Sequence, residues 1–103
     1  EAYDITWTRS ERSIFRSSEK NWRGFCNKCG SPLTYEYDNW VEIAIGTLDN
    51  PDLAQPEVQV NARYQRPCFR HLAELPKKPA ALQSADEDWN NSVVSYQHPD
   101  HDT

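Results

Sequence analysis

Residues 33–45 read LTYEYDNWVEIAI, and the alternation in this stretch predicts a β-hairpin. In each half an apolar side chain occupies every second position, which is the period of a strand that buries one face. The dipeptide Asp38-Asn39 separates the halves and has the residue types of a tight turn. We therefore expect two antiparallel strands joined at Asp38-Asn39, and this hairpin sets the fold class.

Shorter alternating segments flank the hairpin and predict further strands. They cover residues 3–7, 14–17 and 58–62, whereas helical periodicity is poor along the chain. The sequence therefore predicts a mainly β fold built from antiparallel hairpins. The expected core consists of the apolar phase of these strands, namely Tyr3 or Trp7, Val41, Ile43, Ile45, Val58 and Val60.

The segments between and after the strands have a different composition. Residues 46–52 are dense in turn formers and predict an ordered loop in which Asp49 accepts local backbone hydrogen bonds. After Pro76 the sequence allows at most a short helix at residues 80–82. We expect a domain over residues 1–83 and an acidic polar tail over residues 84–103.

Charge and hydropathy exclude several classes of function. All 11 Lys and Arg residues lie within residues 1–83, so the excess of acid that gives the net charge of −5 lies in residues 84–103. A neutral body with an acidic tail lacks the basic face that nucleic acid requires. No apolar run approaches 18 residues, so we expect no membrane span.

Two of the three cysteines form the segment Cys26-Asn-Lys-Cys29, which is followed by Gly30. Thiolates three positions apart can grip one Zn²⁺ when the backbone forms a tight knuckle, and a glycine suits the next position. Such a pair fits a reducing compartment, so we expect a cytoplasmic protein. Two alternatives stay open. They are a redox pair, which the following Ser31-Pro32 disfavours, and two reduced cysteines without metal.

One C-x-x-C pair supplies only half of a tetrahedral site. Cys68 and His71 have the spacing of a second pair, and Cys26, Cys29, Cys68 and His71 would formally complete a four-ligand set. The long separation and the neighbouring Phe69 favour a packing role for Cys68 instead. We expect His98 and His101, which lie in the polar tail, to be solvated.

The order of several motifs resembles one known family. The motifs are Trp7-Thr8, Phe15-Arg-Ser-Ser-Glu19, Arg23-Gly-Phe-Cys-Asn-Lys-Cys-Gly-Ser-Pro-Leu33, Ile45-Gly-Thr-Leu-Asp-Asn-Pro51 and the segment from Arg66 to Pro76. Together they are similar to the glutathione-dependent formaldehyde-activating enzymes, the GFA family, which includes the domain of centromere protein V. The resemblance covers residues 3–79. Cys68 departs from it, because the family commonly has an aromatic residue there.

The resemblance implies a tent-like β fold around a zinc knuckle. It maps Cys26 and Cys29 onto the structural zinc pair, which a C-x-C pair completes in family members. It also implies a separate C-x-C-x-x-C cluster that binds the catalytic zinc. Neither motif is present in these residues. We therefore expect the chain to be the C-terminal portion of a longer protein and to be inactive alone.

The implied activity is that of a zinc-dependent carbon–sulfur lyase. Its partners would be a small thiol such as glutathione and formaldehyde or a related aldehyde, joined as in S-(hydroxymethyl)glutathione. Arginines and lysines in residues 9–28 could face the carboxylates of such a thiol. The alternative is a noncatalytic zinc-ribbon module that binds a protein partner. A metal shared across a symmetric homodimer is a further expectation for an isolated cysteine pair.

Overall fold

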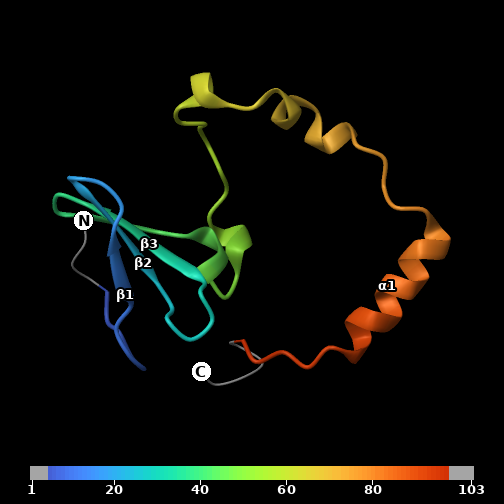
Figure 1. The fold of residues 1–103 in the computed structure, drawn as a ribbon, viewed down its shortest axis with the longest axis horizontal. Helices are drawn as coiled ribbons and strands as arrows, with labels where there is room; N and C mark the ends of the chain where they lie inside the picture. Colours follow the sequence, from blue (N-terminus) through green and yellow to red (C-terminus); the bar gives the residue numbers. More distant parts are fainter. Residues whose placement is uncertain (1–4, 98–103) are drawn as a thin grey trace. The chain divides into compact units, whose positions relative to one another are not determined.

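A four-stranded antiparallel sheet dominates the fold in the computed structural model, which describes residues 5–97 (Figure 1). Its strands follow chain order and are β1 (Ser13–Arg16), β2 (Asn21–Phe25), β3 (Pro32–Tyr37) and β4 (Trp40–Ile43). Each strand pairs with the next, and β1 and β4 are the two edges. The predicted mainly β, antiparallel class is confirmed.

The hairpin predicted at residues 33–45 is β3 and β4. Tyr37 pairs with Trp40, which leaves Asp38 and Asn39 as the two turn residues. Asp38 takes the left-handed conformation at φ 47°, which the short polar side chains of Asp and Asn tolerate better than most. The segment predicted at residues 14–17 is likewise a strand, β1, displaced by one residue.

The strand β2 has no alternating apolar pattern and was not predicted. Its pairing places Ile14, Gly24, Thr34 and Ile43 in one row across the sheet. Gly24 is buried, and a Cβ there would collide with Thr34 Oγ1 and lie 2.8 Å from Arg12 Cδ. The Arg12 side chain therefore crosses the sheet over a glycine, and this glycine removes the apolar residue that would have marked the strand.

The two-residue turn places Val41 and Ile43 of β4 on the face opposite Tyr35 and Tyr37 of β3. Val41 pairs with Glu36, and Ile43 pairs with Thr34, so these two apolar residues share a face with polar ones. Tyr35 and Tyr37 lie on the other face, because successive residues of a strand alternate. Neither face is wholly apolar, and both carry apolar side chains.

No apolar side chain of the described residues is buried, and several predictions of core positions are therefore wrong. Ile43 and Ile45 are 49% and 41% exposed, and Val58 and Val60 are 79% and 78% exposed. The alternation fixes the face of a side chain, but burial also needs a second layer against that face. Trp7 and Val41 are half-buried, and Tyr3 lies outside the described residues.

The segment of residues 3–7 was predicted as a strand, but its described part is not one. The loop after β4 is ordered, as predicted, and contains two 3₁₀ turns, η1 (Ile45–Thr47) and η2 (Pro51–Leu53). In this loop Asn50 Oδ1 accepts a hydrogen bond from Asp52 N at 3.2 Å. The role predicted for Asp49 stays a prediction.

The chain divides into two units, the sheet unit over residues 1–55 and a second unit over residues 56–103. The described part of the second unit contains η3 (Ala62–Tyr64), η4 (Pro67–Glu74) and the helix α1 (Ala80–Ser92). The strand predicted at residues 58–62 is wrong, because Asn61 takes a left-handed conformation at φ 55° and a 3₁₀ turn follows. The boundary predicted at residue 83 stays a prediction, although α1 runs across it.

The helix α1 is longer than the short helix that the sequence analysis allowed. Pro79 occupies the N-cap position, and Ala80, Ala81 and Leu82 have high intrinsic helix propensity. The acidic residues that follow were predicted to form a solvated tail. In the structure Asp86 lies within α1, and it pairs at 2.7 Å with Lys78, which precedes the helix. None of the helices in residues 5–97 is long and apolar enough to cross a membrane.

Candidate functional site

The cysteine pair lies in the loop that joins β2 to β3. Cys26 N donates to Ser31 O at 3.0 Å, and Gly30 N donates to Cys26 O at 2.7 Å. The register shifts between Gly24 and Phe25, so the strands open at a bulge immediately before the loop. These bonds close a tight turn around residues 26–31, which is the backbone shape that a zinc knuckle at the C-x-x-C-G segment would need.

The glycine of this turn is required by its backbone conformation. Gly30 has φ +80°, which side chains other than glycine rarely adopt, although a Cβ there would meet no atom within 4 Å. Gly24 is the opposite case, since it is needed for space. The two glycines of the motif are thus required for different reasons: Gly30 for its backbone conformation in the loop, and Gly24 for the space it leaves in the sheet.

The two thiols emerge from this single turn. Cys26 is half-buried, and Cys29 is exposed with its Sγ 3.2 Å from Ser31 Oγ. None of the three cysteines, all of which lie within residues 5–97, forms a disulfide in the structure. A turn that presents two thiols three positions apart fits half of a tetrahedral zinc site. No cluster of three His, Cys, Asp or Glu side chains that could hold a metal occurs in either unit of the described chain.

The remaining candidate ligands lie in the second unit or beyond the described residues. Cys68 and His71 belong to η4, and both are exposed, so the packing role predicted for Cys68 is wrong. His71 Nδ1 lies 2.9 Å from Glu74 Oε2. His98 and His101 are outside residues 5–97, so their predicted solvation stays a prediction.

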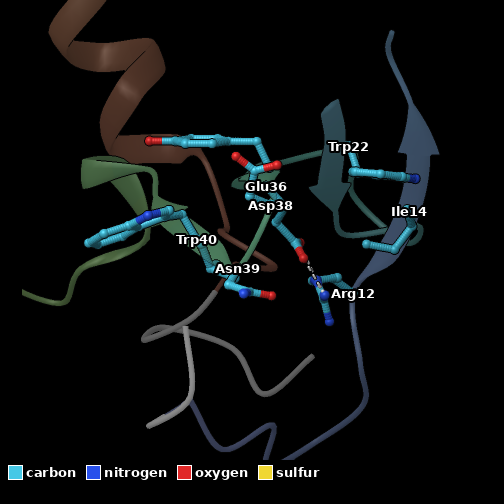
Figure 2. Close-up of a pocket in the computed structure, with 9 residues that line it drawn as sticks. Arg12, Ile14, Trp22, Glu36, Asp38, Asn39 and Trp40 are labelled. Carbon is cyan, nitrogen blue, oxygen red and sulfur yellow. Dashed lines mark hydrogen bonds and ion pairs between the residues drawn. The ribbon is translucent and has the colours of Figure 1, made fainter. Parts of the chain in front are cut away.

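A second group of polar side chains lies on the sheet beside β1 (Figure 2). Arg12 Nε and Nη2 donate to the two carboxylate oxygens of Glu36, each at 2.5 Å. Thr34 Oγ1 donates to Glu36 Oε2 at 2.6 Å, and the Arg12 guanidinium lies 5.1 Å from the Trp7 ring centroid. The pair borders a groove of about 380 Å³ whose lining includes Ile14, Trp22, Trp40 and Val41.

The electrostatics of this pair are mutually consistent. The hydrogen bonds from Arg12 hold the pKa of Glu36 below its ordinary value, against the opposing effect of burial, and Thr34 adds to the lowering. The same bonds raise the pKa of Arg12. Both groups are therefore charged at neutral pH and neutralise each other. The guanidinium fork is occupied by Glu36, so the pair stabilises the sheet and leaves little capacity for an anionic ligand.

Two further arginines of residues 9–28, Arg16 and Arg23, also contact side chains of the sheet unit. Arg16 lies over Trp22 and donates to Glu19 O at 2.8 Å. Arg23 lies 4.9 Å from the Tyr35 ring centroid. The sequence analysis missed the Arg12–Glu36 pair. A glutamate at a strand position that shares its face with apolar neighbours is the signal that could have found it.

Fold and loop together define the chain as a small antiparallel β domain with a cysteine turn between two strands. The model of the GFA family, glutathione-dependent formaldehyde-activating enzyme, matches residues 1–64. The chain belongs to this family. The match contains the whole described sheet and the cysteine turn. It ends before residues 66–76, whose resemblance to the family's closing segment stays a prediction. No curated protein and no solved structure shows significant similarity to the chain.

Proposed function

We propose that this chain is part of a zinc-dependent carbon–sulfur lyase of the GFA type. The observation that carries the proposal is the closed turn at Cys26 and Cys29 inside a domain of this family. The reaction joins a thiol such as glutathione to formaldehyde or a related aldehyde. The sulfur–carbon bond forms, the carbonyl π bond breaks, and the thiol proton ends on the new hydroxyl oxygen.

In this proposal Cys26 and Cys29 supply two thiolates to a structural zinc ion. The metal would cross-link the ends of β2 and β3 and add folding free energy to a domain whose described residues bury no apolar side chain. A zinc ion held by thiolates in the catalytic centre lowers the pKa of a bound thiol. Because the sequence contains no C-x-C pair, the proposal requires the remaining ligands of both sites to come from outside these residues. Thiolate ligands also favour work in a reducing compartment such as the cytoplasm.

Metal binding by single-cysteine variants tests the structural part of the proposal. Cobalt titration of the full chain should give a thiolate-to-cobalt band that Cys26→Ser and Cys29→Ser both weaken strongly. Cys68→Ser is the matched control and should leave the band unchanged. Loss of the band in Cys68→Ser would show that the second pair takes part instead, and an unchanged band in Cys26→Ser would contradict the zinc knuckle.

The second candidate is the noncatalytic zinc-ribbon module that binds a protein. The exposed apolar side chains on both faces of the sheet favour it. The protein isolated from its natural source separates the two candidates. Consumption of formaldehyde in the presence of glutathione, together with an intact mass above 12.0 kDa, supports the lyase. An inactive protein of 12.0 kDa supports the module.

A further inference from the structure

One face of the sheet carries a row of three side chains with opposite charges at its ends. Arg23 pairs with Tyr35 across β2 and β3, and Tyr35 pairs with Glu42 across β3 and β4. Directly paired residues of neighbouring strands point to the same side. Arg23 and Glu42 are exposed, and Tyr35 between them is half-buried. The row is thus positive on β2, aromatic on β3 and negative on β4.

Contacts within the sheet hold both charges in place. The Arg23 guanidinium lies 4.9 Å from the Tyr35 ring centroid, and the Tyr35 and Tyr37 rings are 5.7 Å apart. Tyr37 Oη donates to Glu42 Oε1 at 3.0 Å. The stacked guanidinium keeps N–H groups at its edge, and Glu42 keeps a second carboxylate oxygen. Both ends can therefore accept a further partner without losing these contacts.

We propose that this face of the sheet binds the same face of a second copy of the chain. A two-fold axis parallel to β3, between the two sheets, exchanges the positions of β2 and β4. Arg23 of each copy then faces Glu42 of the other, and the two Tyr35 side chains face each other. Two aligned sheets pack about 10 Å apart in this way.

Self-complementarity is the reason for choosing a second copy as the occupant. The two charges of the row lie one strand away from β3 on either side, so one two-fold operation satisfies both at once. The same face also exposes Phe15 by 63% and Trp40 by 51%, which provides apolar contact around the charged pairs. Like charges do not meet in this arrangement. The inference is independent of the proposed lyase function.

The oligomeric state of the full chain, with charge-reversed variants, tests the proposal. Sedimentation should show a dimer of twice 12.0 kDa that dissociates in about the 1–100 μM range, as suits a small interface. Arg23→Glu and Glu42→Arg should each raise the dissociation constant about tenfold or more, because each turns two attractive pairs into two repulsive ones. Lys20→Glu and Glu19→Arg make the same charge changes in the β1–β2 turn and should leave it unchanged.

A mixture of the two variants gives the decisive result. In a heterodimer of Arg23→Glu with Glu42→Arg, both cross-pairs are again of opposite charge, so mixing should restore dimerisation to near the wild-type level. The double variant should likewise dimerise alone. A monomeric wild type, or a dimer that neither reversal weakens, would overturn the proposal. Failure of both the mixture and the double variant to restore the dimer would overturn it as well.

Discussion

Contacts inside the two units of the chain differ in their range along the sequence. In the sheet unit, side chains distant in sequence are joined, and Arg12 and Glu36 are 24 positions apart. In the second unit the side-chain pairs are local, such as His71 with Glu74 and Lys78 with Asp86. Of residues 56–97 only Ser95 is not classed as exposed. The difference shows that the cysteine turn lies in the unit where long-range strand pairing fixes the backbone.

The family match follows the same division for most of its length. It spans residues 1–64, which include the sheet, the cysteine turn and only the first described turn of the second unit. Long-range strand pairing makes a unit open and close cooperatively, whereas isolated 3₁₀ turns break one at a time. The predictions below use this contrast.

The largest expected effect is a difference in amide hydrogen exchange between the units. Amides of β2 and β3, the two central strands, should exchange about 100-fold more slowly than those of η3 and η4. Mass spectrometry of peptides from exchanged protein measures this directly. Equal protection of η4 and β3 would show that the second unit is as cooperative as the sheet and would contradict the comparison.

The next effect comes from filling the space over β2. Gly24→Ala should destabilise the sheet unit by about 1–3 kcal/mol, because the new Cβ collides with Thr34 Oγ1 and the Arg12 side chain. Gly46→Ala is the matched control, since a Cβ there meets no atom within 4 Å, and it should change stability little. Chemical denaturation measures both. A Gly24→Ala variant as stable as Gly46→Ala would place Arg12 elsewhere.

Local patterns predicted the parts of the fold that depend on a short stretch of sequence. Alternation and a two-residue turn were enough to predict the hairpin of β3 and β4. The zinc knuckle that the C-x-x-C-G spacing favoured stays a prediction, although backbone hydrogen bonds close the turn at Cys26. The strand β2 was missed because Gly24 takes the place of an apolar residue. The need for glycine at this position becomes clear only from the structure, in which the Arg12 side chain passes over Gly24. The sequence alone does not reveal this contact.

Burial could not be predicted from the same patterns. Val41 and Ile43 fall on the face opposite Tyr35 and Tyr37 because Tyr37 pairs with Trp40, and alternation alone does not reveal this relation. Val58 and Val60 alternate as well as Ile43 does, yet they form no strand because they have no partner strand. Alternation is a property of one segment, while pairing is a property of two.

A smaller effect should follow from neutralising the long-range ion pair. Glu36→Gln should lower stability by about 1 kcal/mol at neutral pH, because it removes a charge-assisted hydrogen bond to Arg12. The folded state lowers the pKa of Glu36, so its contribution is present above the ordinary glutamate pKa of about 4.3 and is lost as pH falls through the folded value.

Thermal unfolding over a pH series gives the measurement for Glu36. The gap between wild type and Glu36→Gln should narrow as the pH drops below about 4. Glu19→Gln is the control, since it removes the charge of an exposed ion pair in which the side chains of Arg16 and Glu19 are 57% and 93% exposed. It should change stability by only a few tenths of a kcal/mol. A gap that stays constant down to pH 2 would contradict the role assigned to the Glu36 carboxylate.

The smallest effect should come from the corresponding pair in the second unit. Lys78 and Asp86 are 2.7 Å apart but about half-exposed, so water and salt screen their attraction. Lys78→Gln should lower the helical circular dichroism of the full chain only slightly, equivalent to about 0.5 kcal/mol or less for α1. The sheet should be unaffected, because strand pairing in residues 13–43 does not involve this pair.

The change should disappear in about 1 M salt, which shortens the Debye length to about 3 Å. A loss of most of the helical signal in Lys78→Gln would mean that this single local pair holds α1 together, and the second unit would then depend on its ion pair more than the sheet depends on Arg12 and Glu36.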